Sequence, residues 1–165
     1  MTRKYESDNN RLDNFKTISR EIVENIDDLS TPHTRELFRW WKSYQPNYPK
    51  RSDFDITEHA ALAPYIYLVS VVSPDEFIYR LNGEEVASLV GRSYRMRPIS
   101  TSSEDVGDRL FAQYLSEILK EGKACRCAGD LWIFDRAHLK FESVDCPLTD
   151  KNGEITHILG VLEGV

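Results

Sequence analysis

Residues 65–91 read YIYLVSVVSPDEFIYRLNGEEVASLVG and decide the fold. From Tyr65 to Val72, β-branched and aromatic residues dominate, which predicts a buried strand. A turn over Ser73–Asp75 follows, and Glu76–Asn82 alternates apolar and polar side chains in the manner of a half-buried strand. Gly83–Gly91 then predicts a short helix between two glycines. The stretch therefore predicts an antiparallel pair of strands followed by a helical connection.

Downstream, the chain continues with one long helix and three further strands. Arg92–Ser103 has no regular pattern, and Glu104–Lys120 carries a wide apolar stripe at helical spacing. Patterns typical of strands then occupy Ala124–Ile133, His138–Leu148 and Ile155–Leu162. Strands and helices do not alternate as in a parallel sheet, so the sequence predicts an α+β fold with an antiparallel sheet.

Upstream of Tyr65, the pattern is helical. After a polar tail, Leu12–Leu29 repeats apolar residues at spacings of three and four, which predicts an amphipathic helix. Thr31 and Pro32 are helix-start residues, and a second helix is expected to run to about Tyr44. We therefore divide the chain into a tail and flanking helix over residues 1–30 and a single domain over residues 31–165.

Composition and charge exclude several classes of protein. The chain has 165 residues, enough for one domain, and 41% hydrophobic residues, enough for a core. A net charge of −6 disfavours nucleic acid and anionic lipid as main partners. The longest apolar stretch, Ala60–Val72, is too short to span a bilayer, and the polar start lacks the core of a secretory signal. We expect a cytoplasmic protein, and three cysteines agree with a reducing compartment.

Particular residues from Leu37 to Gly91 add to the element order, which is that of a PAS domain. They are Leu37 and Trp41 on a helix, Pro49, Arg51, Asp53 and Asp55 in PKRSDFD, Leu62 and Pro64 before the first strand, Arg80 and Gly83 in FIYRLNG, and Gly91. In these residues the chain resembles a family of small bacterial single-domain PAS proteins. The last three strands agree with that family by pattern only.

The resemblance implies a five-stranded antiparallel sheet in the order 2-1-5-4-3, with helices on one face and a small cavity between the sheet and the long helix. It also implies a non-catalytic sensory or regulatory module that acts on a protein partner and can be modulated by a small ligand. Similar PAS domains hold haem through a helix histidine or flavin through an Asn-Cys-Arg-Phe helix. The long helix has no histidine and the flavin motif is missing, so we recognise no cofactor.

The candidate ligand-binding residues are Arg80, Tyr114, Trp132 and His157. His157 alternates with Ile155 and Leu159, so it shares their face of the last strand. If that face lines the cavity, His157 and Trp132 supply its polar groups. The alternative for His157 is a core histidine with satisfied hydrogen bonds.

A structural role is expected for the charged residues of the PKRSDFD loop, Arg51, Asp53 and Asp55. A half-buried arginine needs a carboxylate partner because an unpaired charge in a core is costly. We expect Arg80 to pair with Asp53 or Asp55 and so to tie the loop to the sheet. The alternative is that Arg80 anchors an anionic ligand.

The flanking helix predicted over Leu12–Leu29 suggests a homodimer. Its apolar stripe includes Phe15, Ile18, Ile22 and Ile26, and similar PAS domains dimerise through such a helix. The alternative is that this helix folds back onto the chain's own sheet.

The cysteines, histidines and loop arginines carry weaker signals. No histidine or cysteine spacing predicts a metal site. Cys125 and Cys127 share one face of a strand, and a register placing Leu131 opposite Phe141 sends Cys146 to the other face, so we expect small buried packing groups. Arg92, Arg95 and Arg97 form either a solvated loop or a docking point for an acidic or phosphate-bearing partner.

A competing hypothesis is an enzyme or carrier with a cone-shaped α+β fold, similar to ketosteroid isomerase. It requires an Asp or His with a shifted pKa in a deep apolar pocket, for which Asp130 and His157 are the candidates. Strand order distinguishes the two folds, since only the PAS order places Ile155–Leu162 at the centre of the sheet. A third reading is an adaptor without any ligand.

Overall fold

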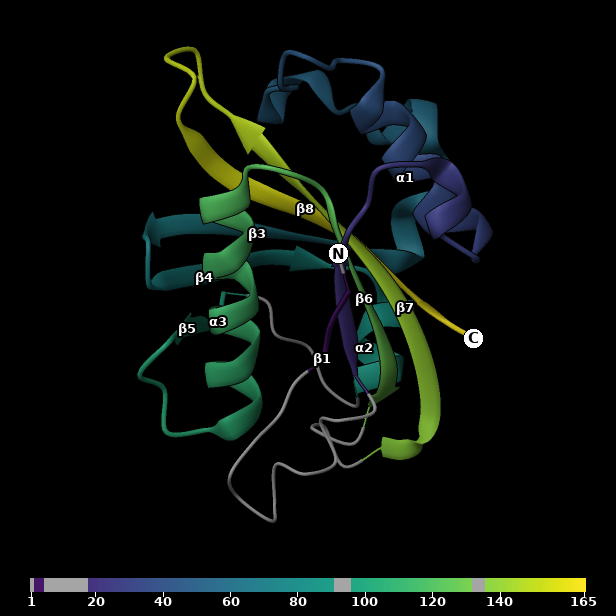
Figure 1. Cartoon of the computed structure of the whole chain (residues 1–165), viewed down its shortest axis with the longest axis vertical. Coiled ribbons are helices and arrows are strands. Elements are labelled where there is room, and N and C mark those ends of the chain that lie inside the picture. The colour runs from purple at the N-terminus through teal and green to yellow at the C-terminus, as the bar shows by residue number, and fades with distance from the viewer. Residues whose placement is uncertain (1, 5–17, 91–95, 132–135) are drawn as a thin grey trace.

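From Pro32 onward, the main helices and strands follow one another in the predicted order. The computed structural model describes residues 2–4, 18–90, 96–131 and 136–165 (Figure 1). The strands are β1 (Thr2–Lys4), β2 (Ser19–Ile22), β3 (Ile66–Ser73), β4 (Glu76–Asn82), β5 (Pro98–Ser100), β6 (Cys125–Leu131), β7 (Arg136–Thr149) and β8 (Ile155–Gly164). The α-helices are α1 (Pro32–Lys42), α2 (Glu84–Val90) and α3 (Val106–Glu121), and the 3-10 segments are η2 (Ile26–Asp28), η3 (Arg51–Asp53) and η4 (Ile56–Tyr65).

The strands form one antiparallel sheet in the order β1-β2-β6-β7-β8-β3-β4-β5. Its five inner strands, β6-β7-β8-β3-β4, are the predicted 2-1-5-4-3 order read from the opposite edge. The last strand, β8, lies between β7 and β3. The predicted fold class is therefore confirmed, and the cone-shaped alternative is wrong. The short strand β5 lies in a segment for which the sequence predicts no regular structure.

Side chains alternate between two buried layers on opposite faces of the sheet. Tyr67 of β3 and Ile158 of β8 belong to the layer that contains α2 and α3, whereas their neighbours Leu68 and Leu159 belong to the layer that contains α1. We call these the α3 face and the α1 face. The prediction that the helices cover one face only is wrong, because Leu37, Phe38 and Trp41 of α1 pack against the second face.

The helix predicted over Leu12–Leu29 is wrong within the described residues. Strand β2 occupies Ser19–Ile22 and pairs with β6, and η2 follows it. A spacing of four, as between Ile18 and Ile22, puts two residues on the same side of a helix and also of a strand. The spacing alone could not separate the two structures, and the β-branched residues are compatible with the strand.

The proposed dimer-helix residues therefore pack within their own chain. Ile18 is 2% exposed and lies in the α3-face layer, with Ile22 packed against the same layer. Ile26 packs against the α1-face layer. Phe15 lies outside the described residues. The apolar stripe thus completes this domain's core in the described part of the chain.

The cysteines occupy the predicted faces although the predicted register is wrong. Phe141 lies opposite Gly129, not opposite Leu131. A slip of two residues leaves every side chain on its original face, whereas a slip of one would reverse them. Cys125 and Cys127 consequently belong to the α3-face layer and Cys146 to the α1-face layer, and all three are buried.

Helix α3 is bounded by polar and glycine signals. The Asp105 side chain accepts a hydrogen bond from the Asp108 N–H at 2.9 Å and caps the first turn. The helix stops at Gly122, whose φ of 64° is in the left-handed region that glycine adopts without strain. Among the described residues, no helix is long and apolar enough to cross a membrane.

Candidate functional site

A buried carboxylate lies at the centre of the α3 face. Asp145 of β7 is completely inaccessible to solvent. It lies opposite Cys125 of β6 on one side and opposite Gly160 of β8 on the other. Because a buried charge is costly without hydrogen bonds, the groups around Asp145 decide what this position can do.

Tyr67 reaches Asp145 across an intervening strand. Tyr67 of β3 lies opposite Gly160, and Gly160 lies opposite Asp145, so the three residues form a row across the sheet. A Cβ atom on residue 160 would lie 2.2 Å from Cζ of Tyr67. Only glycine leaves room for this ring. The Tyr67 hydroxyl then donates a hydrogen bond to Oδ1 of Asp145.

Two further hydroxyl groups complete the shell of the carboxylate. The Tyr114 hydroxyl, from α3, donates to Oδ2 of Asp145 at 2.5 Å. The Ser143 hydroxyl, two residues earlier on β7, donates to the same oxygen at 3.1 Å. We call Tyr67, Tyr114, Ser143 and Asp145 the Asp145 cluster. It connects β3, β7 and α3 through one charged group.

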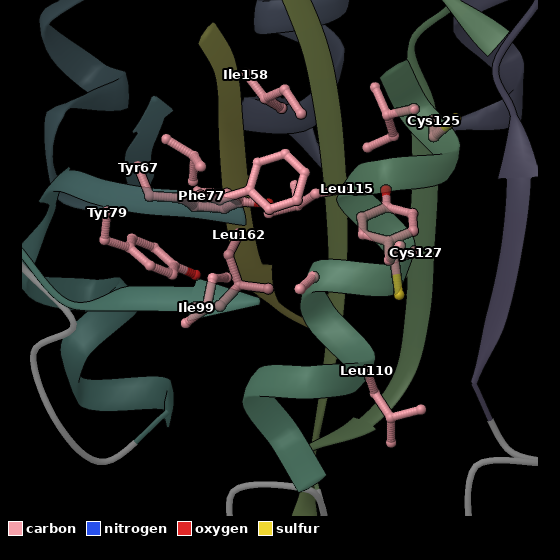
Figure 2. Close-up of a cluster of buried hydrophobic side chains, with 14 of the residues drawn as sticks. Tyr67, Phe77, Tyr79, Ile99, Leu110, Leu115, Cys125, Cys127, Ile158 and Leu162 are labelled. Carbon is pink, nitrogen blue, oxygen red and sulfur yellow. The ribbon is translucent and has the colours of Figure 1, made fainter. Parts of the chain in front are cut away.

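Aromatic rings surround the Asp145 cluster. Phe111 of α3 stacks on Tyr79 of β4, with ring centroids 5.6 Å apart, and its edge meets the Tyr67 ring at 6.1 Å. Figure 2 shows Tyr67 and Tyr79 entering this layer from neighbouring strands, and Leu115 of α3 belongs to the same buried layer. The polar groups of the Asp145 cluster are thus enclosed by apolar side chains.

Burial and hydrogen bonding shift the pKa of Asp145 in opposite directions. Burial raises the pKa from its ordinary value of 3.8 to about 6, while the hydrogen bonds from Tyr114, Tyr67 and Ser143 lower it in part. Burial and the nearby Asp145 charge also raise the pKa values of Tyr67 and Tyr114 well above 10.0. The carboxyl group is therefore the member of the cluster that changes charge near neutral pH.

Arg20 and Cys127 extend the polar groups toward β2. Arg20 lies opposite Cys127 in the register, and its guanidinium carbon is 4.8 Å from the centroid of the Tyr114 ring. Its Nη2 donates to the Leu110 carbonyl of α3 at 3.2 Å. Burial raises the pKa of Cys127 to about 11, although Arg20 lowers it in part. The thiol is protonated at neutral pH and is a weak nucleophile.

The structure separates the predicted ligand-binding residues. Tyr114 belongs to the Asp145 cluster on the α3 face. His157 shares a layer with Leu159, as predicted, but that layer is the α1 face, opposite the long helix. Arg80 donates from Nε to Ser70 Oγ at 2.8 Å, and Ser70 lies opposite His157. Trp132 lies outside the described residues.

The predicted pairing of Arg80 with the loop carboxylates is wrong. Asp53 accepts from the Lys50 N–H at 2.7 Å, and Asp55 accepts from the Thr57 N–H and hydroxyl at 2.9 and 2.7 Å. Each carboxylate caps its own short turn, which a nearby backbone N–H permits with less ordering than a distant arginine requires. A backbone hydrogen bond from Thr149 N–H to the Pro49 carbonyl ties the loop to the sheet instead.

Glu142 is a second buried carboxylate that the sequence analysis missed. It is 1% exposed on the α1 face and accepts hydrogen bonds from the Thr31 N–H at 2.9 Å and the Thr34 hydroxyl at 2.8 Å, both at the start of α1. Arg126 Nε donates to it at 2.7 Å. Burial opposes its charge, but the hydrogen bonds from Thr31, Arg126 and Thr34 outweigh burial and lower the pKa to about 2. Glu142 therefore anchors α1 to the sheet.

One sequence signal could have located both carboxylates. Strand β7 reads FESVDCPL from Phe141 to Leu148, and it is paired with a strand on each side. Its two acidic residues point to opposite faces of the sheet. A central strand buried on both faces tolerates an acid only where partners satisfy it. Arg20 gave no such signal, because a helix was expected there. Of the three arginines in the predicted basic patch, Arg92 and Arg95 lie outside the described residues. The third, Arg97, pairs with Asp108 at 2.5 Å.

Comparison with solved structures gives low-identity matches to light-oxygen-voltage domains. An RNA-binding light-oxygen-voltage receptor matches with 19% identity and a TM-score of 0.46, covering 67% of this chain and 32% of that one. A light-oxygen-voltage domain studied with a flavin analogue matches with 15% identity and a TM-score of 0.43, covering 67% and 83%. The light-state structure of the Aureochrome1 light-oxygen-voltage domain matches with 13% identity and a TM-score of 0.41, covering 67% of this chain and 88% of that one. The chain thus spans about a third of the RNA-binding receptor.

A search of curated proteins gave no match. The family model described as PAS domain matches residues 29–163, which is most of the chain. This range contains α1, α3 and the five inner strands except Gly164 at the end of β8, together with every member of the Asp145 cluster. The chain belongs to the PAS domain family.

Proposed function

We propose that this PAS domain is a non-catalytic sensory and regulatory module and that the Asp145 cluster is its signal-receiving site. The observation that carries the proposal is the triple hydrogen bonding of one buried carboxylate by groups from β3, β7 and α3. A change in the charge or hydrogen bonding of Asp145 alters the attachment of α3 to the sheet. The module converts a local chemical change into a movement of one helix.

The chemistry of the site favours sensing over catalysis. The Asp145 oxygens are occupied by hydroxyl donors, and the Cys127 thiol is protonated at neutral pH because burial raises its pKa to about 11. Nucleophilic catalysis needs an activated nucleophile beside a base. A small ligand with a hydroxyl or amide donor is the expected modulator, since it would replace one tyrosine hydroxyl on the carboxylate.

The output is proposed to be a contact with a protein partner in the cytoplasm. The net charge of −6 disfavours nucleic acid as that partner. Homodimerisation stays a prediction. The flanking helix no longer supports it, because the described part of that segment forms strand β2 and η2. Native mass spectrometry of the purified chain measures bound ligand mass and oligomeric state together, and an absorption spectrum of the same sample detects a chromophore.

Hydrogen exchange of the α3 amides tests the proposed signal path. The comparison is between wild type and Asp145→Asn, which keeps the size of the side chain and removes the charge, at pH values below and above the Asp145 pKa of about 6. We expect the protection of the α3 amides, relative to the other amides of the same protein, to change with pH in wild type and not in Asp145→Asn. Identical pH profiles for the two proteins would refute the assignment of Asp145 as the signal-receiving group.

A further inference from the structure

A second polar site lies on the α1 face, separated from the Asp145 cluster by the sheet. Ser70 of β3 and His157 of β8 lie directly opposite each other. Arg80 of β4 donates from Nε to Ser70 Oγ at 2.8 Å, which holds its guanidinium toward β8. Arg80 is exposed, and His157 is half-buried.

Backbone contacts bring Arg51 to the same place. The Pro49 carbonyl accepts from the Thr149 N–H at 3.0 Å, and Lys50 and Thr149 form a parallel bridge. Thr149 lies opposite Ile155, two residues before His157. Arg51, at the start of η3, follows Lys50 directly, so this bridge places its backbone beside the end of the β7–β8 pair that contains His157. Its positive charge and that of Arg80 both act on the His157 ring.

In the described part of the chain, no carboxylate forms an ion pair with either Arg51 or Arg80. Asp53 and Asp55, the acidic residues nearest to Arg51 in sequence, each use one carboxylate oxygen to cap the turns described above. Two exposed guanidiniums and an imidazole thus share one region with the Ser70 and Thr156 hydroxyls.

We propose that Arg51, Arg80, Ser70 and His157 form a binding site for a free tetrahedral oxyanion of the phosphate or sulfate type. A guanidinium presents two parallel N–H donors that match two oxygens of such an anion. Arg80 is already oriented by its bond to Ser70, so less side-chain entropy is lost on binding. The anion would offset the mutual repulsion of the basic groups.

His157 makes the proposed site sensitive to pH. Burial, then Arg51 and Arg80, lower the pKa of His157 from its ordinary value of 6.5. The charged groups that act on it come from η3 and β4, whereas its sheet neighbours Ser70 and Leu148 are uncharged and the Thr156 hydroxyl lies 3.0 Å from its Nδ1. A bound anion favours the imidazolium, so binding takes up a proton and strengthens as the pH falls.

The experiment is an NMR titration of the histidine rings with sodium sulfate against sodium chloride at equal ionic strength. Sulfate is the probe because its charge does not change over the range in which histidine titrates. We expect sulfate to raise the pKa of His157 more than chloride does, because chloride at equal ionic strength only screens Arg51 and Arg80. The ring signals of His33 and His59, which pair with Glu163 and Glu36, serve as internal references.

Matched variants distinguish a built site from general attraction to positive charge. Arg80→Gln and Arg51→Gln should each weaken sulfate binding about tenfold, in the range of a charge-assisted bidentate contact. Arg39→Gln, at an exposed arginine of α1, should leave binding unchanged. His157→Gln should retain binding at high pH and lose its increase at low pH. The proposal is wrong if sulfate and chloride act alike on His157, or if Arg80→Gln and Arg39→Gln bind sulfate equally.

Discussion

Tyr114 of α3 donates a hydrogen bond of 2.5 Å to Oδ2 of Asp145 on β7, 31 residues further along the chain. Both side chains are buried, and the Arg20 guanidinium lies over the same tyrosine ring. This bond joins the long helix to the centre of the sheet through a group whose pKa is about 6. The proposed coupling of a chemical change to a helix movement rests on this bond.

Tyr114→Phe is expected to destabilise the domain by about 1.5–3 kcal/mol at neutral pH, because it removes a hydrogen bond to a buried charge. The loss should be smaller below pH 6, where Asp145 is protonated and its hydrogen bonds are weaker. Urea unfolding at both pH values measures the difference. Tyr44→Phe, which deletes a hydroxyl outside the cluster, is the control, and an equal effect of the two substitutions would contradict the expectation.

The charge of Asp145 is expected to make the free energy of unfolding fall as the pH rises. The folded-state pKa of about 6 is above the ordinary value of 3.8, so the folded protein binds the proton more tightly than the unfolded one. The proton on Asp145 stabilises the folded protein by roughly 3 kcal/mol below about pH 4, and this stabilisation is lost as the pH rises through 6. Asp145→Asn should remove this slope. If the free energies of unfolding of wild type and Asp145→Asn differ by the same amount at every pH from 4.5 to about 7.5, the expected role of the Asp145 charge is disproved.

Gly160→Ala is expected to displace the Tyr67 ring. The added Cβ would lie 2.2 Å from Tyr67 Cζ, so the ring must leave its place over β8 and its bond to Asp145. We expect a loss of about 2–3 kcal/mol from overpacking, together with a higher Asp145 pKa. Gly164→Ala, on the same strand, is the control because its Cβ would meet Leu89 at an ordinary 3.4 Å. Thermal unfolding of both variants gives the comparison, and similar midpoints would argue against the clash.

Glu142→Gln is expected to loosen α1 from the sheet. The substitution removes the charge that accepts from Arg126 Nε and from the start of α1, leaving the half-buried Arg126 with a weaker acceptor. We expect destabilisation by about 2–4 kcal/mol at pH 7. Because its pKa is held at about 2, the Glu142 contribution is present above its ordinary pKa of 4.5 and is lost only as the pH falls through 2. Urea unfolding of this variant beside Glu76→Gln, an exposed glutamate of β4, checks the result; equal midpoints would refute it.

Ile18→Ala distinguishes a core residue from a dimer contact. Ile18 is 2% exposed within its own chain, so its truncation should cost about 2–4 kcal/mol independently of protein concentration. A contact between chains would instead make the loss depend on concentration. Ile56→Ala, at a side chain that is 40% exposed, is the control. Unfolding transitions measured over a wide range of concentrations decide between the two, and concentration-dependent midpoints for Ile18→Ala would restore the dimer hypothesis.

The amino-acid pattern alone determined the main helices and strands from Pro32 to the end, but not the short strand β5, because alternation and helical spacing are local properties of consecutive residues. It also determined which cysteines share a face, since an even error in register leaves the faces unchanged. Tertiary structure decided the rest. The spacing of Ile18 and Ile22 fits a helix or a strand, and only pairing with β6 selects the strand. The site needed the same information, because Tyr67, Tyr114 and Asp145 are far apart in sequence and meet only once β8 places a glycine between two strands.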